Sequence, residues 1–157
     1  MAGPKKKPGA TPTRVPRARS MKAFLLPLPR AQADAMSLQC RLALEAVRQG
    51  RSERREATCM AQTVLLTGFL AEAGHGLIGL PEIRSVELKV LEMLDRGEAT
   101  GDWLFPEALV NSLVTVVNEH DRQLHETRFE VILNATERLE RMIASAPEKL
   151  SASGRVA

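Results

Sequence analysis

Apolar residues recur at helical spacing through most of the chain from residue 31 onward. Over residues 31–49 the apolar stripe includes Met36, Cys40 and Val47, which fall three or four positions apart or at multiples of that spacing. Gly50 follows the stripe, and glycine favours the left-handed conformation in which many helices end. This pattern predicts a first helix over residues 31–49.

The second predicted helix has an unusual pattern, because residues 57–71, ATCMAQTVLLTGFLA, contain no charge. A membrane-spanning helix needs roughly 18 or more apolar residues, so the segment is too short to cross a bilayer. A helix that is apolar on most sides is instead packed on several faces. We expect Ser52 to cap its start and the glycines of AGHG to end it.

A third helix is predicted over LPEIRSVELKVLEMLDRG, which opens with Pro81 and closes at Gly97. The loop after it contains Trp103 and Phe105, which we expect to cover the edge of the core. Pro106 then opens another helical segment.

The segment from residue 106 to residue 145 presents a choice between one long helix and two. Between Asn118 and Arg128 only Leu124 is strongly apolar, and helical spacing of apolar residues resumes after that stretch. No glycine or proline separates the two halves. We prefer two helices with a break near His125.

These patterns predict an all-α protein in which residues 31–145 form a small bundle of four to five helices. Aromatic residues make up only 3% of the 157 residues, and Ala, Leu, Val, Glu and Arg dominate, which favours helix over sheet. A disordered basic tail, residues 1–30, is expected before the bundle, and a flexible tail, residues 146–157, after it. A chain of this length supports one hydrophobic core.

The N-terminal tail differs from the rest of the chain in its charge. MAGPKKKPGATPTRVPRARSMK contains seven Lys or Arg, no acid, and a proline at every fourth position from Pro4 to Pro16. Proline removes backbone donors and like charges repel, so the segment is predicted not to fold. Within it, LLPLP is expected to lie along the body as a polyproline-like strap. Residues 1–30 carry +8, so residues 31–157 carry −5 of the total of +3.

A flexible basic arm of this kind binds phosphate backbones by releasing counterions, without reading base sequence. We therefore expect a non-enzymatic protein that associates with nucleic acid, as an accessory or transcriptional regulatory protein. Alternative uses of the arm are a solvated tail that maintains solubility, attraction to an anionic membrane surface, and an organelle transit peptide. The residues expected to contact phosphates are Lys5, Lys6, Lys7, Arg14, Arg17 and Arg19.

The last predicted helix supports a second functional hypothesis. Its apolar stripe either packs on the core of its own chain or faces a second copy or another protein. In the latter case the protein is a helical interaction adaptor with no role at nucleic acid. The stripe consists of Phe129, Ile132, Leu139 and Ile143.

The sequence offers little support for catalysis, a metal or a cofactor. His120 and His125 are five positions apart, about 140° around a helix, so they do not readily share a metal; His75 is expected in a turn. Cys40 and Cys59 lack CxxC spacing, so we predict neither a zinc site nor a disulfide, and a reducing compartment. No catalytic motif and no membrane span is recognised.

A helix-turn-helix is poorly supported in VLLTGFLAEAGHG followed by PEIRSVELKV, because the connection of about seven residues exceeds the usual three to four. The stretches AGPKKKPGA, LLPLPRAQADAMSLQCRLALEAVRQG and VLLTGFLAEAGHG resemble short bacterial proteins catalogued as Fis-family transcriptional regulators. The resemblance covers residues 1–80 and implies a bacterial, cytoplasmic protein with a regulatory role. The segment 106–143 lacks the basic recognition helix of Fis proteins, so the resemblance identifies no DNA-contacting residue.

Overall fold

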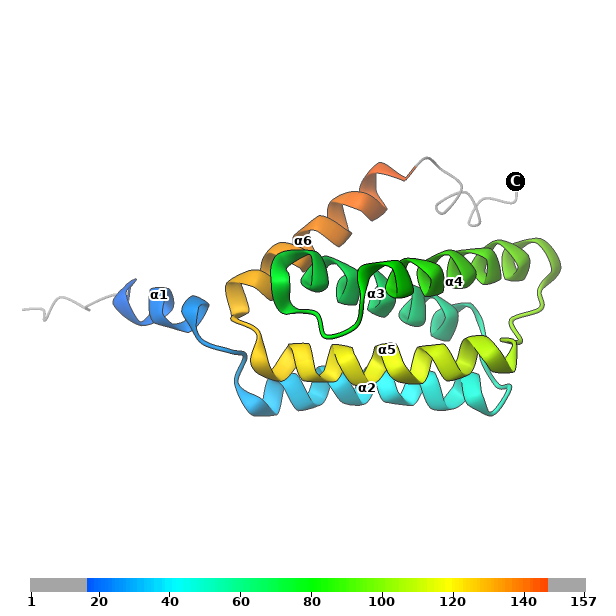
Figure 1. Cartoon of the computed structure of the whole chain (residues 1–157), viewed down its shortest axis with the longest axis horizontal. Coiled ribbons are helices and arrows are strands. Elements are labelled where there is room, and N and C mark those ends of the chain that lie inside the picture. The colour runs from blue at the N-terminus through cyan, green and yellow to red at the C-terminus, as the bar shows by residue number, and fades with distance from the viewer. Residues whose placement is uncertain (1–16, 147–157) are drawn as a thin grey trace, which may run out of the picture.

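The computed structural model describes residues 17–146, with side chains from Met21 onward, and this part of the chain is all-α (Figure 1). No strand occurs within residues 17–146, although an isolated β-bridge pairs Pro27 with Arg128. A short π-helical turn, η1 (Ala71–His75), continues the third helix. The α-helices are α1 (Arg17–Leu25), α2 (Arg30–Arg48), α3 (Arg54–Leu70), α4 (Leu80–Thr100), α5 (Glu107–Glu126) and α6 (Phe129–Ser145).

Four helices, α2 to α5, form an up-and-down bundle, and α6 crosses it obliquely (Figure 1). α2 lies beside α5, and α3 lies beside α4. α3 packs against α2, α4, α5 and α6. This central position explains why residues 57–71 carry no charge, and it confirms the expectation of a helix buried on several faces. The segment tested for a helix-turn-helix is an antiparallel helix pair.

The buried side chains form two clusters. The main core fills the space between α2, α3, α4 and α5 and includes Met60, Ile83, Val90 and Leu113. The second core joins α6 to α3 and to the beginning of α2, and it includes Leu28, Phe69, Leu124 and Leu139. Three of the four stripe residues of the last helix therefore pack within their own chain: Ile132 and Leu139, which are buried, and Phe129, which is partly buried.

The start of α3 differs from the sequence prediction, because Ser52 is not its cap. Glu53 occupies the N-cap and forms a capping box with Glu56, in which each side chain accepts from the other residue's backbone N–H. The Ser52 hydroxyl instead donates to the carbonyl of Trp103 at 2.7 Å. Ser52 thus holds the α4–α5 loop against the end of the bundle.

The end of α4 also differs, because the helix passes through Gly97 and stops at Gly101, which has φ +72°. Gly97 is needed for packing and not for termination: a Cβ atom there would lie 2.1 Å from Cε3 of Trp103. The Trp103 ring occupies the space that a side chain at Gly97 would fill, and Phe105 is buried. The expectation that both residues cover the core edge is therefore confirmed.

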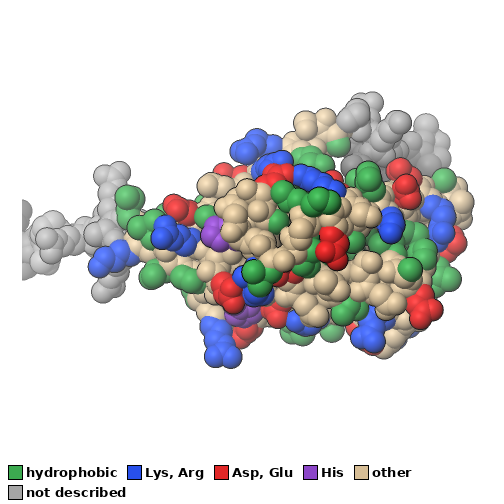
Figure 2. All heavy atoms as spheres, in the orientation of Figure 1, with side chains coloured by type: hydrophobic (Ala, Val, Ile, Leu, Met, Phe, Trp, Pro, Cys, Tyr) green, Lys and Arg blue, Asp and Glu red, His purple; other side chains and the backbone are tan. Residues whose placement is uncertain are grey.

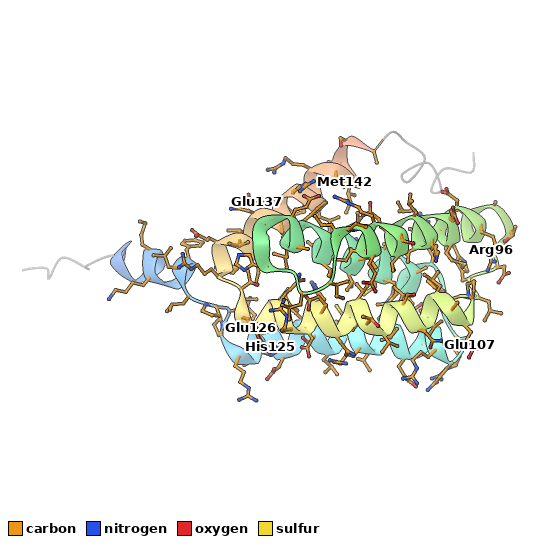
Figure 3. All side chains as sticks on the ribbon, viewed as in Figure 1. Arg96, Glu107, His125, Glu126, Glu137 and Met142 are labelled. Carbon is orange, nitrogen blue, oxygen red and sulfur yellow. The ribbon has the colours of Figure 1, made fainter. Side chains whose placement is uncertain are left out.

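The break between α5 and α6 near His125 is confirmed, and residues 26–29 of the LLPLP strap cross it. The backbone N–H of Phe129 donates to the carbonyl of Leu26 at 2.9 Å, beside the bridge between Pro27 and Arg128. Leu28 is buried in the second core. Figure 3 places His125 at the end of α5, next to this bend.

The N-terminal segment is helical over part of the range predicted to be disordered or extended. Helix α1 begins at Arg17, directly after Pro16, the last of the regularly spaced prolines. Its sequence RARSMKAFL contains no proline or glycine, so backbone propensity permits a helix there. Residues 1–16 and 147–157 lie outside the described residues. No helix among those of residues 17–146 has both the length and the apolar character needed to cross a bilayer.

Candidate functional site

The described part of the basic arm, residues 17–30, meets the body at one end of the bundle. α1 contacts α6, where the ring of Phe24 stacks on Phe129 with centroids 5.6 Å apart. Arg17 and Arg19 lie on α1, which projects beyond the end of the bundle (Figure 1). The backbone of α1 thus carries these two expected phosphate-binding residues away from the body. The others lie outside the described residues: Lys5, Lys6, Lys7 and Arg14.

On the body, arginines are largely balanced by acids. Arg41 pairs with Asp121 and Arg54 with Glu98, each at 2.8 Å. On the face shown in Figure 2, Lys and Arg side chains alternate with Asp and Glu over the bundle. Further pairs join Arg84 to Glu72 and Glu87, Arg96 to Asp102, Arg122 to Glu119 and Glu126, and Arg138 to Glu72. The unbalanced positive charge of the sequence is therefore in the arm.

The polar stretch that interrupts the apolar pattern of α5, residues 118–126, faces three different neighbours. We call this stretch the α5 polar segment. One side faces the connection between α3 and α4, a second faces α2, and His120 faces the interior. The stretch is polar because it makes these contacts over the last two turns of α5, which ends at Glu126.

The first side anchors the α3–α4 connection, and we call Glu119, Arg122 and Gln123 the loop anchor. Glu119 is 6% exposed and accepts from the backbone N–H of Leu77 at 2.8 Å and from Arg122 at 2.7 Å. Arg122 also donates to the carbonyl of His75 at 2.8 Å. The hydrogen bond from Arg122 lowers the pKa of Glu119, against burial, and the Leu77 N–H adds to the effect.

The second side joins α5 to α2. Burial raises the pKa of Asp121, but hydrogen bonds from Ser37 and Arg41 outweigh it, so the pKa is lowered. His125 Nε2 lies 2.7 Å from Asp34 Oδ1, and its Nδ1 lies 2.8 Å from the Asp121 carbonyl. The hydrogen bond to that carbonyl, followed by the one to Asp34, raises the pKa of His125.

The third side brings together Cys40 of α2, Cys59 and Thr63 of α3, and His120 of α5, which we call the thiol cluster. The Cys40 sulfur lies 3.5 Å from the Thr63 hydroxyl oxygen. Cys59 and the ring of His120 are also within hydrogen-bonding reach of that sulfur. His120 is 4% exposed, and its Nδ1 has no hydrogen-bond partner. Three helices therefore bring two thiols and a buried imidazole ring together.

The surroundings make the two thiols chemically different. A hydrogen bond from Cys59 lowers the pKa of Cys40, with smaller contributions from His120 and Thr63, although burial opposes the change. The same hydrogen bond and burial raise the pKa of Cys59. The first proton therefore leaves Cys40, and the resulting thiolate is the stronger nucleophile.

Sequence reasoning missed this cluster because it looked for close cysteine spacing. Cys40 lies on the inward stripe of its predicted helix and Cys59 lies in the uncharged helix, which is the signal that the sequence offers. Helical periodicity does not show which inward positions of different helices meet.

The two other histidines stay apart from the cluster: His125 faces Asp34, and His75 lies in η1, as expected for a turn residue. No group of three or more His, Cys, Asp or Glu side chains is arranged to hold a metal ion in the described part of the chain.

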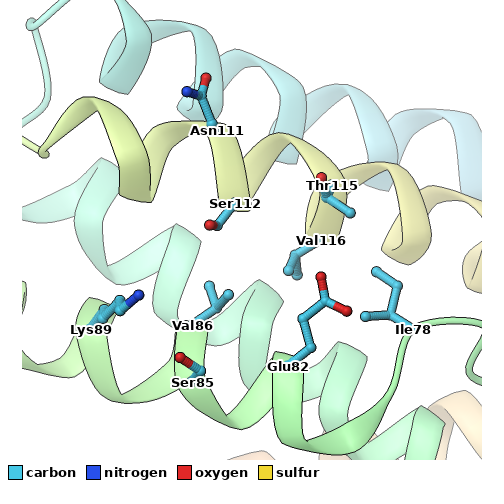
Figure 4. Close-up of a pocket in the computed structure, with 9 residues that line it drawn as sticks. All are labelled: Ile78, Glu82, Ser85, Val86, Lys89, Asn111, Ser112, Thr115 and Val116. Carbon is cyan, nitrogen blue, oxygen red and sulfur yellow. The ribbon is translucent and has the colours of Figure 1, made fainter.

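A groove between α4 and α5 encloses about 450 Å³ (Figure 4). Glu82 and Lys89 on α4 and Asn111 on α5 bring polar groups of different charge to its walls, over the apolar side chains of Val86 and Val116. Unlike the thiol cluster, it contains neither cysteine nor histidine.

The chain as a whole matches no known protein family, no curated protein and no solved structure.

Proposed function

We propose that the protein is a non-enzymatic, nucleic-acid-associated accessory or transcriptional regulatory protein whose basic arm contacts phosphates. The separation of charge carries the proposal: residues 1–30 hold eight Lys or Arg and no acid, whereas residues 31–157 have a net charge of −5. A polyanion attracts the arm and repels the body.

The attachment of α1 also supports a role in which the arm, and not the body, contacts phosphates. The arm meets the body at the stack of Phe24 on Phe129 and at the strap residues 26–28. Binding through such an arm gains affinity from counterion release and supplies no base specificity. The resemblance to Fis-family regulators adds a bacterial, cytoplasmic setting to the proposal.

The test compares two full-length variants that each lose six positive charges. The arm variant replaces Lys5, Lys6, Lys7, Arg14, Arg17 and Arg19 by Gln. The control variant replaces exposed body residues by Gln: Arg48, Arg51, Arg55, Lys89, Arg128 and Arg141. Fluorescence anisotropy with a duplex of arbitrary sequence, over a range of salt concentrations, gives the affinity of each.

For the wild type we expect log affinity to fall against log salt with a slope as steep as about −5 if all six arm residues bind phosphates. The control variant keeps most of this slope, and the arm variant loses it. Binding that survives in the arm variant, or absence of binding by the wild type, contradicts the proposal.

The outer end of α6 favours a second candidate, a helical interaction adaptor. Beyond Leu139, Met142 and Ile143 are 43% and 47% exposed although they continue the apolar side of the helix. Figure 3 shows Met142 on this outer part of α6. A second copy or another protein would cover these side chains.

Sedimentation equilibrium of Met142→Ser/Ile143→Ser tests this candidate for a second copy. If α6 is the contact, the wild type associates and the variant does not. The matched control, Leu88→Ser/Leu104→Ser, removes two exposed leucines elsewhere on the body. It should associate to the same oligomeric state as the wild type. A monomeric wild type contradicts self-association through α6.

A further inference from the structure

We propose that Cys40 and Cys59 form an oxidation-sensitive pair, in which Cys40 reduces a hydroperoxide and Cys59 then closes a reversible disulfide between α2 and α3. This inference is independent of the proposed role of the arm. It rests on the thiol cluster, in which two cysteines from neighbouring helices meet beside His120 and Thr63.

The fixed packing of the helices brings the two sulfurs together. α2 and α3 are adjacent in the bundle, and both cysteines pack against the main core. The Cys59 thiol is close enough to hydrogen-bond to the Cys40 sulfur. Thr63 ties the pair to its helix, because its hydroxyl donates to the Cys59 carbonyl at 2.8 Å and lies 3.5 Å from Cys40. A disulfide joining these positions links α2 to α3 inside one chain.

A small oxidant has access to the pair. Neither cysteine is fully buried. Cys59 lines two surface hollows, one between α2 and α3 beside Gln39 and Leu42, and one along α3 beside Arg54 and Gln62. A hydroperoxide is small enough to enter these hollows, which open beside Cys59 and beside Gln39, the residue before Cys40.

The cluster assigns different roles to the two cysteines. The hydrogen bond from Cys59, with a smaller contribution from His120, favours the thiolate of Cys40, which makes Cys40 the attacking group. Cys59 keeps its proton, since burial and the neighbouring thiolate both disfavour a second negative charge. Cys59 is therefore the resolving thiol.

The chemistry balances with a hydroperoxide as the oxidant. The Cys40 thiolate attacks one peroxide oxygen, the O–O bond breaks, and Cys40 becomes a sulfenic acid while the alkoxide or hydroxide leaves and takes a proton. Cys59 then attacks the Cys40 sulfur, the S–O bond breaks, and the departing hydroxide leaves as water with the Cys59 proton. Two thiols and one hydroperoxide thus give one disulfide, one alcohol or water from the peroxide, and one water.

The test treats reduced full-length protein with hydrogen peroxide and analyses it by mass spectrometry. We expect the wild type to lose two hydrogens, to yield a non-reduced peptide in which Cys40 is joined to Cys59, and to recover both hydrogens with dithiothreitol. In Cys59→Ser, dimedone labels a sulfenic acid at Cys40. In Cys40→Ser, the labelling of Cys59 is at least tenfold lower.

Two controls separate this site from ordinary thiol oxidation and from misfolding. Circular dichroism and the urea midpoint show whether each Ser variant is folded, and the wild type unfolded in urea gives the reactivity of the cysteines without the cluster. Disulfide-linked dimers in place of the internal bond overturn the proposal. Equal dimedone labelling of the two variants, or folded wild type that reacts no faster than the unfolded chain, does so as well.

Discussion

Two adjacent residues of α5 are both buried and polar but differ in their hydrogen-bond partners. Glu119, in the loop anchor, accepts hydrogen bonds from Leu77 and Arg122. His120, in the thiol cluster, has a buried Nδ1 atom without a partner. Both side chains are almost fully buried, so the difference between them lies in their partners.

The difference teaches that its hydrogen-bond partners, and not its burial alone, decide whether a buried polar group stabilises the fold. A buried carboxylate that is paired and hydrogen-bonded holds its neighbours in place, and here it fixes the α3–α4 connection. A buried polar atom without a partner costs free energy, on the order of 1–3 kcal/mol. His120 Nδ1 and Gln123 Oε1 both carry this cost in the described part of the chain, whereas the Glu119 carboxylate does not.

The largest expected effect comes from breaking the loop anchor. Glu119→Ala removes the acceptor of the Leu77 N–H and leaves the partly buried Arg122 with fewer partners. We expect a loss of about 3 kcal/mol in the free energy of unfolding, measured by urea denaturation.

Glu126→Ala is the matched control, because it removes another carboxylate that pairs with Arg122 but is 62% exposed. Its expected cost is below about 1 kcal/mol. Equal losses in the two variants would show that the burial of Glu119 contributes nothing.

A smaller effect is expected at the neighbouring residue. His120→Leu replaces an incompletely bonded imidazole by an apolar side chain of similar size, so the free energy of unfolding should change by no more than about 1 kcal/mol. The same variant should slow sulfenic acid formation at Cys40, because one hydrogen-bond partner of its sulfur is lost.

Two measurements on His120→Leu, urea denaturation and dimedone labelling, therefore separate a structural role from a chemical one. A loss as large as that of Glu119→Ala, with unchanged oxidation of Cys40, would assign His120 to structure and remove it from the proposed site.

The smallest effect is expected on the α2-facing side of the α5 polar segment, where His125 is partly exposed. Its pKa is raised above 6.5 in the folded protein, so its contribution is fully present below that value and is lost as the pH rises through the raised pKa. We expect the urea midpoint to fall with rising pH above 6.5 by an amount equivalent to about 0.5 kcal/mol. His125→Gln should flatten this dependence.

Asp34→Asn provides the control for that titration. It removes the charge beside His125 Nε2 and leaves the Asp121 carbonyl in place, so it should reduce the pH dependence without abolishing it. An unchanged pH dependence in both variants would show that another group titrates in this range.

Most of the fold was predictable because its helices follow the sequence pattern closely. The first helix, the buried second helix and the break near His125 all occur where apolar spacing placed them. Three predictions failed. Residues 17–25, expected to be disordered or extended, form α1. Ser52 and Gly97, expected as a cap and as a stop from local preference, both contact Trp103 from another part of the chain.

The sequence by itself determined the helical class, the helix that is buried on several sides, and the concentration of positive charge before residue 31. These properties follow from local spacing and composition, which act within a few residues. Only the tertiary structure decided that Cys40, Cys59 and His120 meet, and that the α5 polar segment contacts three different neighbours. The physical reason is that periodicity fixes the side of a helix that faces inward, whereas the packing of the bundle decides which inward residues touch.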